Sequence, residues 1–128
     1  MQPLERILYA EDEADIQQVT SLALEVVGNF TLKTCSSGLE AINQIESFDP
    51  QLILFDVMMP EMDGPSALAK IRQMDAYKDT PAIFMTAKIQ PAEIQLYLDM
   101  GAVDVIAKPF DPMTLASQIQ EIWKKVHS

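Results

Sequence analysis

The chain has 128 residues, 48% of them hydrophobic, which suits a single globular domain spanning residues 1–128 with a sizeable core. Its 19 acidic and 9 basic residues give a formal net charge of -10, which repels nucleic-acid phosphates. We therefore expect protein or cation partners and no nucleic-acid binding by this chain alone. Because no apolar run approaches the roughly 20 residues that cross a bilayer and no signal-peptide pattern is present, we expect a cytoplasmic protein with no membrane contact.

Five short segments have the character of β-strands. Continuous apolar runs at Ile7–Ala10, Leu52–Phe55 and Ala82–Met85 indicate strands buried on both faces. Phe30–Cys35 alternates between apolar and polar residues, which is typical of a strand at the edge of a sheet. A fifth strand is predicted at Val103–Ala107.

Helical periodicity separates these strands. The helices are predicted at Asp15–Val27, Leu39–Phe48, Ala67–Met74, Gln90–Met100 and, after a cap at Asp111 or Thr114, from Leu115 to Val126. The spacing on the first helix predicts a buried stripe of Ile16, Val19, Leu22, Ala23 and Val26, with Gly28 ending the helix.

The alternation of strands and helices predicts an α/β fold. Right-handed crossovers, with the apolar strands central, favour a doubly wound, flavodoxin-like sheet of five parallel strands in the order 2-1-3-4-5, with five helices. The carboxyl ends of parallel strands share one edge, where such folds bind ligands. Polar residues follow four of the predicted strands: Glu11 and Asp12, Asp56, Thr86, and Lys108.

This set of polar residues predicts phosphoryl chemistry. Three carboxylates that share a partly desolvated crevice repel one another unless cations offset them, and a hard divalent ion with one lysine would do so. Carboxylate oxygens favour Mg²⁺, which keeps open positions for phosphate oxygens. Asp56, held by a buried strand beside the metal, could then attack phosphorus in line, with Lys108 and Thr86 contacting phosphoryl oxygens.

Four motifs carry a family resemblance. ILYAEDE, LILFDVMMPEMDG, FMTA and AKPF, in this order and after the predicted strands, resemble the receiver domains of two-component response regulators. The resemblance covers essentially the whole chain. It implies a role for each motif residue: Asp56 as phosphoacceptor, Glu11 and Asp12 as the acidic pair, Met58 as a metal ligand through its backbone carbonyl, Thr86 as the switch hydroxyl, and Lys108 as the phosphate contact before a cis Lys108–Pro109 bond.

The same resemblance implies the partners and the kind of activity. A histidine kinase, a phosphotransfer protein or a small acyl phosphate would be the donor, and a downstream protein or output domain would receive the signal. The chain would be no conventional enzyme, since it would catalyse only its own phosphorylation and dephosphorylation. Two positions depart from the family pattern: Glu11 stands where aspartate is commoner, and Val105 stands where many relatives have an aromatic switch residue.

Three other functions are compatible with parts of this pattern. A phosphatase of the haloacid dehalogenase-like type needs a second aspartate two positions after the nucleophile, where this chain has Met58. A flavodoxin-like cofactor site would need a phosphate-binding loop in place of EDEAD. A phosphorylation-independent interaction module is the remaining alternative, which Val105 keeps open.

The fourth predicted helix carries more apolar residues than one buried face requires. Ile94, Tyr97 and Leu98 form one stripe, which leaves three apolar residues partly surplus: Ile89, Leu96 and Met100. Surplus apolar surface can mark an interface, so a partner or homodimer contact through the fourth helix and fifth strand is a hypothesis, beside simple coverage of loop edges within the monomer.

Overall fold

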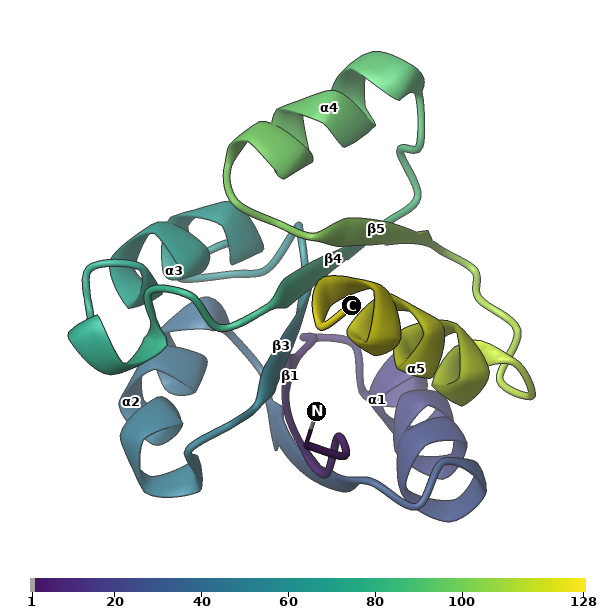
Figure 1. Ribbon diagram of the computed structural model, residues 1–128. Coiled ribbons are helices and arrows are strands. Elements are labelled where there is room, and N and C mark those ends of the chain that lie inside the picture. The colour runs from purple at the N-terminus through teal and green to yellow at the C-terminus, as the bar shows by residue number, and fades with distance from the viewer. Residues whose placement is uncertain (1) are drawn as a thin grey trace.

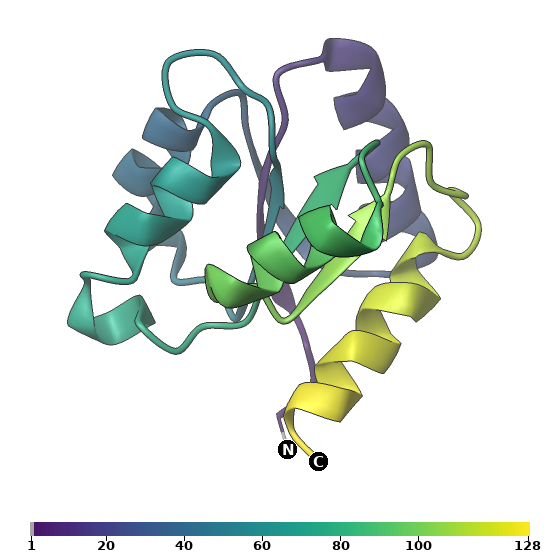
Figure 2. The same ribbon diagram turned by 90° about the horizontal axis from the view of Figure 1, so that it is seen from above.

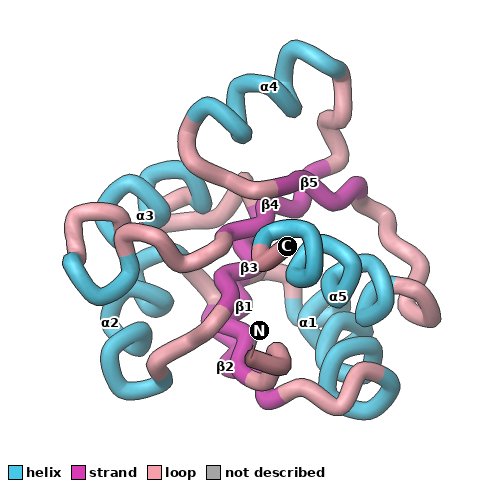
Figure 3. The backbone as a smooth tube through the Cα atoms, viewed as in Figure 1, coloured by secondary structure: helices cyan, strands magenta, loops and turns pink. Residues whose placement is uncertain are grey.

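The computed structural model describes residues 2–128 and has a central parallel sheet between two layers of helices (Figure 1). The strands are β1 (Arg6–Ala10), β2 (Thr31–Cys35), β3 (Leu52–Asp56), β4 (Ala82–Thr86) and β5 (Asp104–Ala107). All neighbouring strands pair in parallel, in the order β2-β1-β3-β4-β5 (Figure 3). This confirms the predicted fold class and strand order, including the edge position of β2.

The helices cover both faces of the sheet. They are α1 (Ala14–Ser21), which continues as the π-helix η1 (Leu22–Val27), then α2 (Gly38–Phe48), α3 (Gly64–Ile71), the 3₁₀ turn η2 (Asp75–Tyr77), α4 (Pro91–Asp99) and α5 (Leu115–Val126). α1 and α5 lie on one face and α2 and α3 on the other, with α4 beside β5 (Figures 1 and 2). None of the described helices is long and apolar enough to span a bilayer.

Burial on both faces explains the continuous apolar runs of the central strands. Successive strand residues point to opposite sides, so Ile7 and Tyr9 join the core under α1 and α5, while Leu8 and Ala10 join the core under α2 and α3. Every residue of β3 and β4 is buried. The sheet therefore holds its strand ends rigidly.

The predicted stripe of the first helix is wrong at three of its five positions, whereas Ala23 is buried as predicted. Val19, Leu22 and Val26 are 40%, 60% and 71% exposed, whereas Thr20 and Leu24 are fully buried. Thr20 can be buried because its hydroxyl donates to the Ile16 carbonyl at 2.8 Å and accepts from the Tyr9 hydroxyl at 2.9 Å. The hydrogen bond between the Tyr9 and Thr20 hydroxyls thus places Thr20 on the buried face of the helix, and hydrophobic periodicity cannot predict such a tertiary contact.

The end of the same helix also differs from the simple prediction. Gly28 follows the last π-helical residue, as predicted, but its φ of -86° is open to any residue, and the left-handed residue is Asn29 with φ 59°. A Cβ on Gly28 would lie 2.8 Å from the Cβ of Ala116 in α5. Close packing of the two helices is therefore what requires glycine here.

Capping side chains set the starts of α2 and α3. Ser37 caps α2 by accepting from the Glu40 amide at 3.1 Å. α3 begins three residues before the predicted Ala67, because the Asp63 carboxylate accepts from the Ser66 amide at 2.7 Å. Thr114 precedes α5 without a capping side-chain bond.

Candidate functional site

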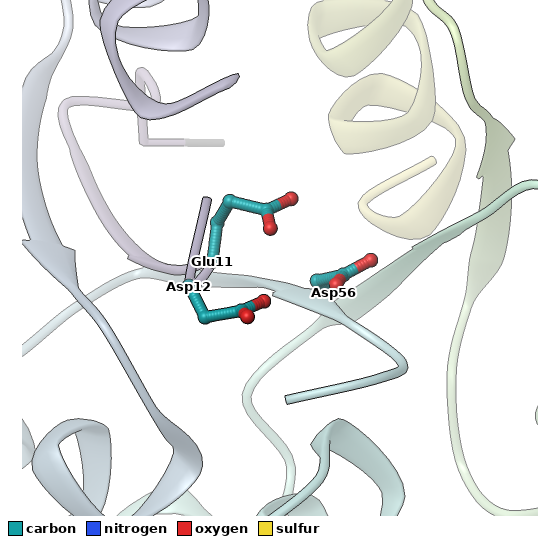
Figure 4. Close-up of side chains that lie close together, drawn as sticks. All are labelled: Glu11, Asp12 and Asp56. Atoms are coloured by element: carbon teal, nitrogen blue, oxygen red, sulfur yellow. The ribbon is translucent and has the colours of Figure 1, made fainter. Parts of the chain in front are cut away.

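The carboxyl edge of the sheet brings together the polar residues that the sequence singled out. Asp56 and Thr86 are the last residues of β3 and β4, and Glu11 and Lys108 directly follow β1 and β5. Figure 4 shows the side chains of Glu11, Asp12 and Asp56 extending from two neighbouring strand ends toward a common region. Carboxylate oxygens of all three lie within 4.8 Å of one another.

The lysine at this edge pairs with two of the carboxylates. Lys108 Nζ lies 2.9 Å from Glu11 Oε1 and 3.0 Å from Asp56 Oδ1. The side chains of Glu11 and Asp56 are 1% and 8% exposed, whereas Asp12 is open to solvent. Three carboxylates and one ammonium leave a net charge of about -2 when all four are ionised.

Burial dominates the electrostatics of this cluster. It raises the pKa of Glu11 and of Asp56 above their ordinary values, and the hydrogen bonds from Lys108 offset only part of that rise. Burial alone would lower the pKa of Lys108, but its bonds to the two carboxylates outweigh that effect and raise the pKa. The charged cluster therefore has a deficit of positive charge.

The backbone around Asp56 is fixed by close contacts. The Val57 amide donates to the Met85 carbonyl at 3.2 Å, and the Gly64 amide donates to the Val57 carbonyl at 3.0 Å. A Cβ on Gly64 would stand 2.3 Å from the Asp56 carbonyl oxygen, so the start of α3 can approach the strand end only with glycine. Sequence reasoning quoted this glycine in LILFDVMMPEMDG but assigned it no role.

Thr86 links the site to the loop that follows β4. Its side chain is buried, and its Oγ1 accepts a hydrogen bond from the Lys88 amide at 3.1 Å. Its carbonyl accepts from the Lys108 amide at 2.9 Å, which holds the ends of β4 and β5 together. The Lys108–Pro109 bond is cis, as the resemblance implied.

Two of the three carboxylates, those of Asp12 and Asp56, open into a surface pocket of about 400 Å³. Asp12, Asp56, Thr86 and Lys108 line it, and so does Met58. The Met58 side chain is 75% exposed, and its carbonyl accepts no hydrogen bond from any described residue. A free backbone carbonyl beside carboxylate oxygens suits a hard cation better than the thioether sulfur would.

Gln17 and Val105 also have contacts that bear on the site. The Gln17 side-chain amide in α1 donates to the Glu11 carbonyl, a contact with no sequence signal. Val105, at the position that is often aromatic, is half-buried and packs against the core under α2 and α3.

Comparisons with known proteins agree on one family. A family model described as response regulator receiver domain matches residues 7–120. The chain is 32% identical over 123 residues to a probable transcriptional regulator, ycf27, of Guillardia theta, covering 96% of this chain and 47% of that protein. It is 38% identical over 104 residues to the transcription factor SKN7 of Saccharomyces cerevisiae, covering 81% of this chain and 16% of that protein.

Solved structures show the same likeness. The chemotaxis response regulator CheY4 of Vibrio cholerae superposes with a TM-score of 0.86 at 28% identity, covering 94% of this chain and 99% of that one. A receiver domain from a Syntrophus aciditrophicus histidine kinase gives a TM-score of 0.81 at 30% identity, covering 95% and 92%. The chain spans about half the length of most of the curated relatives it matches.

Proposed function

Because the chain belongs to the response regulator receiver family, and is thus a receiver domain of two-component signalling, we propose that Asp56 is its phosphoacceptor. One observation carries the proposal: Asp56 ends a fully buried strand and faces two more carboxylates and one lysine. A rigid carboxylate in this setting is positioned for in-line attack on phosphorus. We treat residues 1–128 as one receiver unit, whatever the length of the protein that contains it.

The donor atoms fit Mg²⁺. The carboxylates of Glu11, Asp12 and Asp56 and the carbonyl of Met58 are all hard oxygen donors, and the cluster lacks positive charge. We propose that these residues hold the ion, with Glu11 binding directly or through water. When bound, Mg²⁺ would offset negative charge on the transferring phosphoryl group.

The protein residues then have separate roles. An Asp56 oxygen forms the new bond to phosphorus as the bond to the donor nitrogen or oxygen breaks. Lys108 pairs with Asp56 in this structure, and after phosphoryl transfer its ammonium group would contact a negatively charged phosphoryl oxygen instead. The Thr86 hydroxyl would donate a hydrogen bond to a second phosphoryl oxygen. The chain would thereby catalyse its own phosphorylation and, with water as acceptor, its own dephosphorylation.

We propose that the donor is a histidine kinase, a phosphotransfer protein or a small acyl phosphate, acting in the cytoplasm. The receiver of the signal would be a downstream protein or an output domain, in line with relatives named as transcriptional regulators. An aspartyl phosphate adds roughly -1.5 to -2 charge units if it resembles other side-chain phosphates. That added charge would be the trigger for a change in the partner-binding surface.

The face formed by α4 and β5 is a candidate for that surface. Leu96 and Met100 are 51% and 42% exposed, which agrees with the predicted surplus, and the loop residue Val103 is 36% exposed. A downstream protein or a second copy could cover them. Residues 89–107 hold 3 acidic and no basic residues, so like charges would meet in a symmetric dimer, which favours a different protein. Replacing Leu96 and Met100 with polar residues should abolish partner binding or dimerisation, and unchanged association would refute this role.

Intact-mass measurement tests the phosphoacceptor. Incubation with a small acyl phosphate and Mg²⁺ should add one phosphoryl group that hydroxylamine removes, and the adduct should be missing when Mg²⁺ is omitted or in Asp56→Asn. If no adduct forms and Mg²⁺ does not bind in a titration, the chain functions as an interaction module in its unmodified state.

A further inference from the structure

Glu93, in the first turn of α4, has an unusual carboxylate. Its Oε2 atom is buried, and among residues 2–128 it is the only buried side-chain oxygen or nitrogen without a hydrogen-bond partner. Buried polar atoms are nearly always partnered, since leaving one unpaired is costly. An unpaired acceptor of this kind is therefore available to any donor that moves within its reach.

The surroundings of Glu93 limit which donor that is. The side chain lines a surface pocket of about 470 Å³ whose other walls are residues 87–91, the loop between β4 and α4. Two residues of this loop, Ala87 and Lys88, also line the pocket around Asp56. The loop thus borders both the unpaired carboxylate and the phosphoacceptor, and its main-chain amides are candidate donors for that carboxylate.

Helix geometry also directs Glu93 toward that loop. Gln90 is the N-cap of α4, so Glu93 is the third helical residue, the position from which a glutamate reaches back to the amide of the cap. In this structure that hydrogen bond is not formed, because no amide of the loop donates to the Glu93 carboxylate among the described residues.

One loop amide is held by Thr86 instead. The Lys88 amide donates to Thr86 Oγ1 at 3.1 Å, so the hydroxyl that the proposed function assigns to the phosphoryl group also anchors the loop. If Thr86 turns toward Asp56, Oγ1 moves away from that amide. The amide then needs another acceptor, and the unpaired acceptor beside this loop is Glu93 Oε2.

We propose that Glu93 is a positioning residue for Thr86: it accepts the β4–α4 loop amide that Thr86 releases when its hydroxyl turns to the phosphoryl group. This inference rests on the proposed function of Asp56. The exchange keeps the number of satisfied amides constant and gives the previously unpaired carboxylate a donor, so the phosphorylated arrangement gains a charge-assisted hydrogen bond. It also ties the first turn of α4 to the state of Asp56.

Binding of beryllofluoride, a phosphoryl mimic, tests the proposal by calorimetry in saturating Mg²⁺. Glu93→Ala should weaken beryllofluoride binding about tenfold, which is about 1.4 kcal/mol, and Glu93→Gln, which keeps a neutral acceptor, should lose less. Removing a negative charge would by itself strengthen binding of an anion, so the expected direction is opposite to a simple charge effect. Asp99→Asn, a loss of one acid at the other end of α4, is the matched control and should not weaken binding.

Two further readouts separate positioning from general stability. In a Thr86→Ala background, Glu93→Ala should cause no additional loss of beryllofluoride affinity, because there is then no Thr86 hydroxyl to release the loop amide to Glu93. Hydrogen exchange at the Lys88 amide should stay slow in the beryllofluoride complex of the unsubstituted chain and become fast in that of Glu93→Ala.

The outcomes distinguish this inference from the proposed function. Beryllofluoride affinity of Glu93→Ala equal to that of the unsubstituted chain, or an equal loss with and without Thr86, would overturn the role of Glu93 and leave Asp56 as phosphoacceptor. Failure of the unsubstituted chain to bind beryllofluoride would instead contradict the proposed function and this inference with it.

Discussion

Replacing Asp56 with asparagine should make the Mg²⁺-free protein more stable. Asp56 is 5% exposed, and its carboxylate oxygens lie within 4.8 Å of those of Glu11 and Asp12. Burial raises its folded-state pKa above the ordinary 3.8, so the ionised form is disfavoured in the native structure. The variant keeps an oxygen that can accept from Lys108 but removes the buried charge.

The size of the effect follows from the distances. At an effective dielectric constant of about 20, repulsion from Glu11, whose carboxylate lies within 4.8 Å, costs at least about 3.5 kcal/mol, and desolvation adds about 3 kcal/mol. Attraction to Lys108 Nζ at 3.0 Å offsets about 5.5 kcal/mol. With Asp12 screened by solvent, the net gain on substitution is at least about 1 kcal/mol. For 128 residues that raises Tm by at least about 4 °C.

Thermal unfolding in chelator and in Mg²⁺ measures this directly. In chelator the advantage of Asp56→Asn should be absent below pH 3.8, grow from there up to the raised folded pKa, and stay constant above it, because in that interval Asp56 is ionised in the unfolded chain but still protonated in the folded one. Mg²⁺ at about 100 times its Kd should stabilise the unsubstituted chain by about 2.7 kcal/mol and the variant by less. A variant less stable than the unsubstituted chain in chelator, or equal stabilisation of both by Mg²⁺, would refute the electrostatic reasoning.

Three other predictions concern the site and the core. Lys108→Met leaves two buried carboxylates without their cation and should cost about 3 kcal/mol at pH 8 and less at pH 5, measured by urea unfolding beside the exposed control Lys124→Met. Equal losses at the two pH values would contradict this. Gly64→Ala should cost about 1 to 3 kcal/mol in the same assay, because its Cβ would stand 2.3 Å from the Asp56 carbonyl oxygen, and an unchanged midpoint would show that the backbone yields. Burial raises the pKa of the Cys35 thiol to about 12, so a disulfide reagent at pH 8 should label it only after unfolding in urea, and rapid labelling of the folded protein would refute its burial.

The strand order and the cluster of polar residues could be predicted from sequence because both depend on connectivity. Once Leu52–Phe55 and its neighbours are taken as parallel buried strands, the residues that follow them must share one edge. The ion pairs of Lys108 with Glu11 and Asp56 are a consequence of that edge.

The first helix shows where periodicity fails. Leu22 has the spacing of a core residue but is 60% exposed, and Thr20 is buried because the Tyr9 hydroxyl reaches it across 11 residues of chain. Gly64 and Glu93 were missed for a related reason. Position 64 needs glycine, and the Glu93 oxygen lacks a partner, because of how closely separate elements of the fold approach each other. Residue types and their spacing in the sequence do not predict such distances.

The measurement that tests the central claim most directly is the location of the phosphoryl group. After incubation with a small acyl phosphate and Mg²⁺, borohydride reduction converts an aspartyl phosphate to homoserine, which tandem mass spectrometry locates in the sequence. The structure predicts homoserine at position 56, where a rigid strand end meets the acidic cluster and the lysine. Reduction at Asp12 or Glu11 instead, or none in a protein that binds Mg²⁺, would contradict the assignment of Asp56 as phosphoacceptor.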